Sequence, residues 1–116
     1  MDMKIYNLER IVSVVRNLID PELPIQQLAL LLLVAEVGDE GITMPEACEK
    51  LGMGQTSVSK NAKVLSRYAE KRGRHMEIKG YALIESRPDL WERRRLRMTI
   101  TPKGIDVLEK IMKEVV

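Results

Sequence analysis

Basic side chains concentrate in the middle of this 116-residue chain. Residues 1–59 carry four Lys or Arg against nine Asp or Glu, a net charge of −5, whereas residues 60–103 carry thirteen against five, a net of +8. The last thirteen residues add −1. Because a solvated face normally mixes both signs, this asymmetry predicts that the middle of the chain meets a polyanion. Chance clustering of surface lysines is the competing interpretation.

The remaining chemistry-bearing residues indicate neither catalysis nor metal binding. Cys48 and His75 lack the spaced partners that a zinc site needs, and no Gly-rich phosphate loop, nucleophile elbow or catalytic carboxylate pair occurs. We therefore expect that the protein is not an enzyme and that it binds no cofactor and no metal. A single cysteine cannot form an internal disulfide and fits a reducing compartment, and the sequence shows no secretory leader. The longest apolar run, residues 28–35, is too short to span a bilayer. We therefore expect a cytoplasmic protein that does not enter a membrane.

Two helices are predicted before residue 40. The first should end near Asp20-Pro21, and the second should span residues 25–37, which are apolar almost all round, as in a helix at the centre of a small domain. The stripe of the first helix could pack on its own domain or on a second subunit. That stripe contains Ile5, Leu8, Ile11, Val12, Val15, Leu18 and Ile19.

A helix-turn-helix is predicted next. Thr43 and Glu46 form a capping box that starts a third helix, and a glycine-bearing turn at residues 52–54 ends it. A fourth helix should run over about residues 55–71. Its buried face should hold Val58, Ala62, Leu65 and Ala69, and its polar face Thr56, Ser59, Lys60, Lys63 and Arg67. Such a second helix can enter the DNA major groove, although amphipathic helix pairs also occur as purely structural elements.

A hairpin and a last helix should follow. Residues 81–87 read as one strand, and residues 95–100 alternate basic and apolar side chains as a second strand. Trp91, in the connecting loop, is better explained as a packing anchor for the hairpin than as a wedge inserted into DNA. Thr101 should cap the last helix. Its inner stripe should contain Ile105, Leu108, Ile111, Met112 and Val115.

The order of these elements resembles the MarR family of winged-helix transcriptional regulators. The likeness is carried by Gly41-Ile42-Thr43-Met44-Pro45-Glu46, by residues 51–60, by Gly80-Tyr81-Ala82-Leu83-Ile84-Glu85 and by residues 95–104. The resemblance implies a mainly α fold with a small β-hairpin: a winged helix-turn-helix with terminal helices for dimerisation. Residues 70–79 depart from the family pattern, and they either extend the fourth helix or form a basic loop.

We accordingly divide the chain into a dimerisation helix at residues 1–20, a DNA-binding core at residues 24–101 and a C-terminal helix at residues 102–116 that lies at the dimer interface. The recognition helix is expected over residues 55–71 and the basic wing over residues 83–100. The expected DNA-binding residues are Gln55, Thr56, Ser57, Ser59, Lys60, Lys63, Arg67, Lys71, Arg72, Arg74, Arg93, Arg94, Arg95 and Arg97. The expected dimerisation residues are Ile5, Leu8, Ile11, Val12, Val15, Ile19, Leu108, Ile111 and Met112.

The expected function is that of a homodimeric repressor that reads a palindromic operator in double-stranded DNA. Long cationic side chains suit phosphates, whereas Gln55 can read adenine and Lys60 guanine. Two alternatives stay open: an architectural or replication/recombination accessory DNA-binding protein, and a winged-helix module that docks an acidic protein. The sequence specifies neither the operator nor any small-molecule or protein effector.

Overall fold

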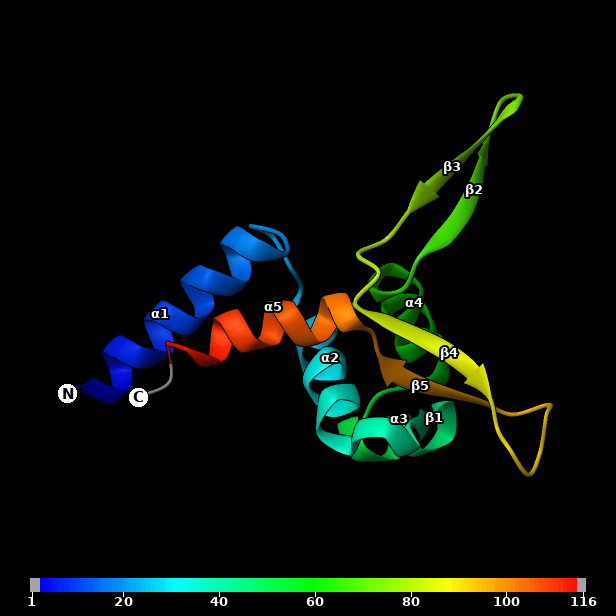
Figure 1. Ribbon diagram of the computed structural model, residues 1–116, viewed down its shortest axis with the longest axis horizontal. Helices are drawn as coiled ribbons and strands as arrows, with labels where there is room; N and C mark the ends of the chain where they lie inside the picture. The colour runs from blue at the N-terminus through cyan, green and yellow to red at the C-terminus, as the bar shows by residue number, and fades with distance from the viewer. Residues whose placement is uncertain (1–2, 115–116) are drawn as a thin grey trace.

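Helices form the body of the molecule, and two hairpins project from it. The computed structural model describes residues 3–114, and Figure 1 shows α1 and α5 side by side at one end, with both hairpins directed away from them. The elements are α1 (Met3–Leu18), α2 (Ile25–Val37), the short 3-10 helix η1 (Gly38–Glu40), β1 (Ile42–Thr43), α3 (Met44–Leu51), α4 (Gln55–Leu65), β2 (Tyr68–Arg72), β3 (His75–Lys79), β4 (Ile84–Pro88), β5 (Leu96–Ile100) and α5 (Pro102–Met112).

The core is organised around α2. Leu30, Leu31 and Val34 of this helix are completely buried, which confirms the buried central helix predicted for residues 25–37. Apolar residues from every other helix and from the wing strands complete the core. These are Val15, Ala47, Val58, Ala62, Leu65, Ile84, Met98, Val107, Leu108 and Ile111. Among the described residues, no helix is both long and apolar enough to cross a membrane.

The helix-turn-helix consists of α3 and α4. Thr43 and Glu46 form the predicted capping box, because the Thr43 side chain accepts from the Glu46 backbone N–H and the Glu46 carboxylate accepts from that of Thr43. Gly52 ends α3 in the left-handed region at φ 63°, a conformation that glycine adopts without steric cost. The second helix of this pair, α4, starts at Gln55 as predicted.

The predicted extension of α4 to residue 71 is wrong. The helix ends at Leu65, and Ser66 has extended backbone angles with its N–H still bonded to the carbonyl oxygens of Ala62 and Lys63. Residues 68–79 then form the β2–β3 hairpin, so they are neither helix nor loop. Ala69, expected on the buried helix face, is exposed on β2.

The wing is a β4–β5 hairpin that belongs to a larger sheet. Strands in this sheet follow the order β1-β5-β4, with Ile84 opposite Ile100 and Ile42 opposite Met98. The first wing strand starts at Ile84 and not at Tyr81 as predicted. The two-residue strand β1 was not predicted, and it joins the wing directly to the start of the helix-turn-helix.

The β2–β3 hairpin leaves the body and returns to it at one narrow point. The backbone N–H groups of Tyr81 and Leu83 donate to the carbonyl oxygens of Val64 and Leu65, so the chain rejoins the end of α4. Gly80 has φ 93°, and a Cβ there would overlap the Ser66 carbonyl oxygen, so only glycine fits. The hairpin is therefore an insertion whose two ends meet beside Ser66.

The terminal helices pack together within one subunit. Contacts join α1 to α5, Val15 and Leu108 are buried in the core, and Arg10 forms an ion pair with Glu114 at 3.6 Å. Thr101 caps α5 as predicted by accepting from the Gly104 N–H. Ile105 and Met112, expected on the inner stripe, are instead exposed, and Val115 lies outside the described residues.

Candidate nucleic-acid interface

The outer face of α4 presents short polar and cationic side chains to solvent. Val58 and Ala62 are buried on the opposite side of the helix, which fixes its orientation. The exposed residues on α4 are Gln55, Thr56, Ser59, Lys60 and Lys63. No ion pair joins Lys60 or Lys63 to any residue in the range 3–114, although the Lys63 ammonium lies 4.9 Å from the centre of the Tyr68 ring. This face can therefore offer hydrogen-bond donors and positive charge to a partner.

Ser57 faces a different environment. Its side chain is half-buried, and its hydroxyl donates to the Gln26 side-chain oxygen of α2 at 3.5 Å. That contact turns Ser57 toward the neighbouring helix, whereas Thr56 stays exposed.

The start of α4 and the wing border one open hollow. Gln55 lies on one side of it, Arg94 and Arg95 lie on the other, and Met44 and Pro45 of α3 contribute to its lining. Residues separated by about forty positions in the sequence thus meet on one surface. A single extended ligand could contact α4 and the wing together.

The wing arginines differ in whether a carboxylate pairs with them. Arg93 and Arg94 are exposed in the loop between β4 and β5, and neither has an ion-pair partner within the described part of the chain. Arg95 lies 3.7 Å from the Glu92 carboxylate, an exposed pair of little energetic consequence. All three guanidinium groups can reach an approaching polyanion.

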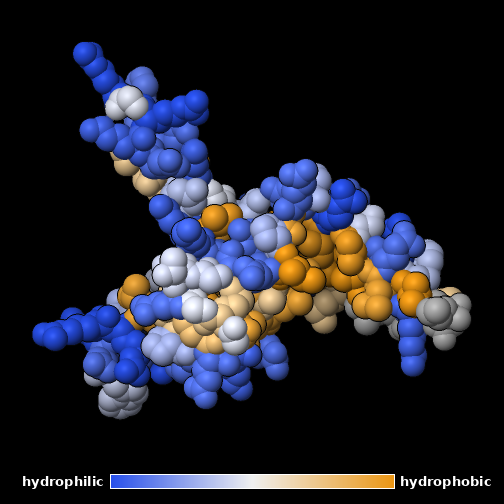
Figure 2. Space-filling model, turned by 180° about the vertical axis from the view of Figure 1, so that it is seen from behind, coloured by the Kyte–Doolittle hydropathy of each residue, from blue (hydrophilic) through white to orange (hydrophobic). Residues whose placement is uncertain are grey.

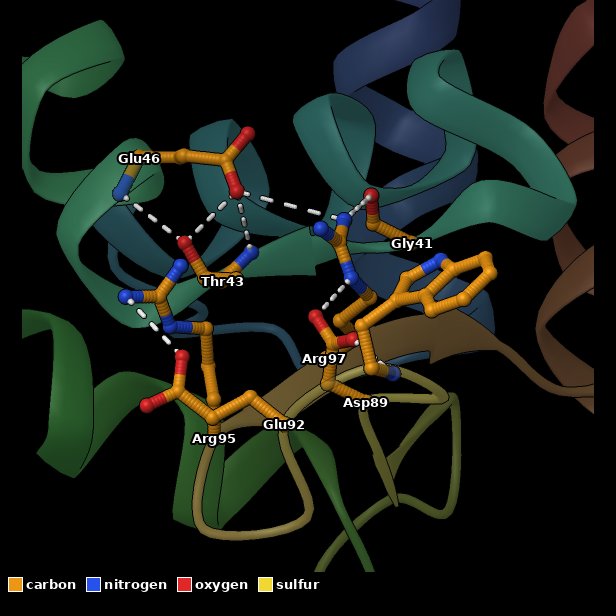
Figure 3. Close-up of polar contacts among 8 residues, drawn as sticks. Gly41, Thr43, Glu46, Asp89, Glu92, Arg95 and Arg97 are labelled. Carbon is orange, nitrogen blue, oxygen red and sulfur yellow. Dashed lines mark hydrogen bonds and ion pairs between the residues drawn. The ribbon is translucent and has the colours of Figure 1, made fainter.

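Arg97 instead holds the wing to the helix-turn-helix (Figure 3). Its Nε donates to Asp89 Oδ2 at 2.8 Å, and its Nη1 donates to the Gly41 carbonyl oxygen at 3.4 Å and lies 3.9 Å from Glu46 Oε1. The hydrogen bond to Asp89 raises the pKa of the guanidinium. The sequence pattern groups Arg97 with the expected DNA-binding arginines, but its contacts are those of a brace that joins β5 to the loop after β4, to the residue before β1 and to α3.

Asp89, which sequence reasoning did not single out, is the partner of that brace. The residue is buried, and its carboxylate accepts from the Trp91 N–H and from Arg97, contacts that lower its pKa in that order of importance. An Asp that bonds its own backbone two residues on is a common turn signal, so the Pro88-Asp89 pair could have indicated this role.

The expectation for Trp91 is wrong. The indole is 94% exposed at the tip of the wing, and neighbouring Leu90 is 93% exposed. Trp91 therefore does not anchor the hairpin by packing.

The basic residues of the β2–β3 hairpin also divide into two groups. Arg72 pairs with Glu77 at 3.1 Å, and Lys79, which was not among the expected site residues, pairs with Glu70 at 3.0 Å. The remaining cations are exposed and have no ion pair within residues 3–114. They are Arg67, just before the hairpin, and Lys71 and Arg74 within it. The hairpin has a positive surface, but two of its cations are already neutralised.

The expected dimerisation residues are split between the surface and the core. Exposed apolar side chains lie on both terminal helices, and Figure 2 shows apolar surface over this end of the molecule. The exposed residues of the set are Ile5, Leu8, Val12 and Met112. Ile11 and Ile19 are half-buried, and Val15, Leu108 and Ile111 are buried inside the subunit. No group of three or more His, Cys, Asp or Glu within residues 3–114 could hold a metal ion.

These features define a winged helix-turn-helix protein with helical termini. The amino-acid sequence matches no protein-family model and no curated protein. Among solved structures, the fold is similar to that of MarR, with a TM-score of 0.63 and 18% identity over 95% of this chain and 70% of MarR. A mutant of S. aureus MepR gives the same TM-score and identity over 95% of this chain and 71% of MepR.

PcaV from Streptomyces coelicolor, solved in complex with its natural ligand, is also similar. It has a TM-score of 0.59 and 17% identity over 89% of this chain and 62% of PcaV. These likenesses confirm the fold predicted from the resemblance: the chain has a MarR-like winged helix-turn-helix fold.

Proposed function

We propose that this protein is a non-enzymatic, sequence-specific transcriptional regulator that binds double-stranded DNA in the cytoplasm as a homodimer and represses transcription from a palindromic operator. One observation carries the proposal: Gln55 at the start of α4 and Arg94 and Arg95 of the wing border the same hollow. The MarR-like fold supports it, because a helix-turn-helix can place its second helix in the major groove.

The two parts of this surface have different tasks. Gln55, Thr56, Ser59 and Lys60 are short or directional enough to contact base edges, and their groups match the acceptors and donors of the major groove. Arg93, Arg94 and Arg95 neutralise phosphates beside the groove, as do Lys71 and Arg74 where the β2–β3 hairpin reaches the backbone. Phosphate contacts then supply affinity, and α4 supplies sequence preference.

The exposed apolar side chains of the terminal helices support dimerisation. A second copy of the chain that covers Ile5, Leu8, Val12 and Met112 would remove them from water and place two α4 helices in successive major grooves. Changing Leu8 and Val12 together to Glu should give monomers in sedimentation, whereas Asn17→Glu, an exposed polar position of the same helix, should not. A persistent dimer in the double variant would exclude α1 as the interface.

Selection of bound sequences from a random duplex pool tests the function. We expect one palindromic site that binds at least ~10³-fold more tightly than random DNA at physiological salt. Lys60→Ala should relax base preference, whereas Lys110→Ala, in an exposed ion pair on α5, should not. Equal affinity for all duplexes would favour an architectural protein, and no affinity for DNA would favour a protein-interaction module.

An effector is a further part of the proposal. BpsR of Bordetella bronchiseptica, similar to this chain with a TM-score of 0.60, has its DNA binding regulated by 6-hydroxynicotinic acid. We infer that DNA binding by this chain is also regulated by an effector, whose identity a screen for altered binding to the selected site would give.

A further inference from the structure

A second hollow lies on the opposite face of the wing from the one that Gln55 borders. Successive residues of β5 point to opposite faces of the sheet, so Arg97 and Thr99 line this second hollow, whereas Met98 lines the first. Its other walls come from η1 and from the loop after β4, and its volume is about 420 Å³, within the range of small-molecule sites. We call this space between η1 and the wing the outer hollow.

Leu90 and Trp91 form the apolar side of the outer hollow. Both side chains are almost fully exposed to water. A ligand that lay against them would remove apolar surface from water, and the face of the indole attracts rings and cations. This side of the hollow therefore favours a ligand with an apolar, aromatic body.

Asp39 and Glu40 supply negative charge on the side of the outer hollow that η1 forms. Both side chains are exposed, and neither forms an ion pair with any residue in the range 3–114. They border the same hollow as Trp91. Carboxylates beside an aromatic ring can bind an organic ammonium group, because the face of the ring also attracts positive charge.

The two arginines that line the outer hollow are already paired. Arg87 donates to the Glu85 carboxylate, and Arg97 donates to Asp89 at 2.8 Å. Neither guanidinium therefore cancels the charge of the two carboxylates on η1. The charge that remains to attract a ligand is negative, which favours a cation.

Thr99 gives an independent indication that a polar ligand binds here. The residue lines the outer hollow and is 7% exposed, and its hydroxyl has no hydrogen-bond partner within the described part of the chain. Most buried polar side chains have such a partner. An N–H group on a ligand would supply it, so a primary or secondary amine fits better than a quaternary ammonium.

Arg97 connects the outer hollow to the proposed DNA-binding surface. It lines the hollow, and its contacts with Asp89, Gly41 and Glu46 hold the wing to the start of the helix-turn-helix (Figure 3). A change in these contacts would move the wing, together with the arginines near its tip, relative to α4.

We propose that the outer hollow binds a protonated organic amine, with its aromatic part against Trp91 and its ammonium group beside Asp39 and Glu40. Occupancy weakens DNA binding, because the ammonium group competes with Arg97 for Asp89 and loosens the hold of the wing on the helix-turn-helix. This second step rests on the proposed function, whereas the amine site does not. The proposal gives the effector a chemical class and a place on the molecule.

Fluorescence of Trp91, the only tryptophan of the chain, tests the amine site without DNA. The full-length protein is titrated with phenethylammonium, and with phenethyl alcohol and phenylacetate as uncharged and anionic controls of similar size. We expect a saturable change in emission with a dissociation constant on the order of 1 mM for the cation, and binding at least about tenfold weaker for both controls. A linear change equal to that of N-acetyltryptophanamide, or equal binding of the alcohol, would overturn the site.

Variants test the carboxylates on η1. Asp39→Asn together with Glu40→Gln should weaken phenethylammonium binding about tenfold, because the shape is kept and the charge is lost. Glu49→Gln, which removes an exposed carboxylate on α3 away from the hollow, should have no effect. Unchanged affinity in the double variant would overturn the proposal. All three side chains are exposed, so the variants should fold normally, which a thermal melt checks.

Thr99→Val tests the hydrogen bond to the amine. Valine keeps the shape of the side chain, and removal of an unpartnered buried hydroxyl should not destabilise the protein. The variant should bind phenethylammonium more weakly than the parent does, but should bind its N-trimethyl form, which has no N–H, equally well. Parent-like binding of both cations would show that Thr99 does not select a primary or secondary amine.

DNA binding is then measured with and without the amine at matched ionic strength. Saturating phenethylammonium should weaken binding of the parent to the selected duplex by about fivefold or more, and should have no such effect on the double variant of Asp39 and Glu40. A saturable Trp91 signal with unchanged DNA affinity would overturn the regulatory step and leave the amine site standing. If no duplex is bound at low salt without amine, the proposed function fails, and the Trp91 titration still decides the amine site.

Discussion

The β2–β3 and β4–β5 hairpins have strands of equal length, yet they are attached to the molecule in different ways. Strand β5 also pairs with β1, and Ile84 and Met98 of the wing enter the core. The β2–β3 hairpin pairs only with itself, and its strands contain no buried residue. Figures 1 and 2 show both hairpins as arms that leave the body in separate directions.

The difference in attachment implies a difference in what each hairpin can do. A hairpin embedded in the core sheet holds its tip at a fixed place relative to α4, so it can contribute to recognition of a defined position in the DNA. A hairpin joined only at its base cannot hold a side chain to that precision. Its cations, Lys71 and Arg74, are suited to phosphates, which tolerate variable geometry.

Removing two cations from each hairpin gives the largest expected effect. Arg93→Ala with Arg94→Ala should weaken binding to the selected site by roughly ten- to hundredfold. The dimer loses two arginines from each subunit, so its salt slope should fall by about 3.6, because each neutralised phosphate contributes about 0.9 to that slope. Lys71→Ala with Arg74→Ala should weaken binding less, and equally for selected and random duplexes. Fluorescence anisotropy at several salt concentrations measures both, and equal losses of affinity from the two pairs would break the comparison.

Breaking one ion pair in each hairpin should give the next largest effect. Arg97→Ala leaves the Asp89 carboxylate without its cation, and we expect the melting temperature to fall by about 6 °C because a buried hydrogen-bonded charge is left unpaired. The matched change Arg72→Ala removes an exposed pair with Glu77 and should lower it by less than about 2 °C. Similar decreases in the two variants would show that the wing is no more firmly joined to the body.

Tyr81 tests the point where the chain returns from the β2–β3 hairpin. Its hydroxyl donates to Asp20 at 2.7 Å, and burial, followed by this hydrogen bond, raises the pKa of Tyr81 to about 12. Tyr81→Phe should lower the melting temperature by about 3 °C at neutral pH because one hydrogen bond is removed.

The raised pKa of Tyr81 also gives a pH dependence. Since the folded pKa exceeds the unfolded value of about 10, the contribution of Tyr81 to stability is complete below pH ~10 and is lost as the pH rises toward 12. The stability measured by denaturation between about pH 9 and about pH 12 should therefore fall more steeply for the parent than for Tyr81→Phe. Parallel curves would show that the hydroxyl does not retain its proton in the folded state.

Replacing residues 68–79 with a short Gly-Ser linker should have the smallest effect on stability. The hairpin contributes no buried residue and its two ends meet beside Ser66, so we expect a change in melting temperature of less than about 2 °C. A circular dichroism melt measures it. If this variant no longer unfolded cooperatively, the hairpin would contribute to the stability of the rest of the molecule.

Features governed by local chemistry were predictable from the sequence. The capping residues Thr43 and Thr101 start α3 and α5 as expected, because a cap needs only the backbone within three residues. The apolar segment at residues 25–37 was also placed correctly, since a helix that is apolar on every side must be covered by the rest of so small a domain.

Features that depend on distant partners were not predictable. Strand β1 has only two residues and is defined by its pairing with Met98 and Arg97 of β5. The hairpin of residues 68–79 is joined by cross-strand ion pairs such as Glu70–Lys79, without a buried face to give an alternating pattern. The spacing of Ala69 matched the buried stripe of α4 by coincidence, which extended the predicted helix too far.

In the candidate site, too, local features were predictable and features that depend on distant partners were not. The exposed face of α4 follows from helical periodicity, so Thr56, Ser59, Lys60 and Lys63 lie where they were expected. Alternation over residues 95–100 placed Arg95 and Arg97 on one basic face, but the structure holds Arg97 against Gly41 and Asp89 while Arg95 stays exposed. A single-strand pattern does not reveal which residues another element covers.

The narrow attachment at Gly80 and Ser66 also has a consequence for motion. The hydrogen bonds from Tyr81 and Leu83 to the end of α4 lie on the body side of this junction, so the strands beyond it can separate without disturbing them. Amide protons of β2 and β3 should then exchange with solvent through a local opening, while those of α2 and β5 exchange only on global unfolding. The protein would behave in solution as two cooperative units of very unequal size, joined where the two ends of the hairpin meet beside Ser66 and Gly80.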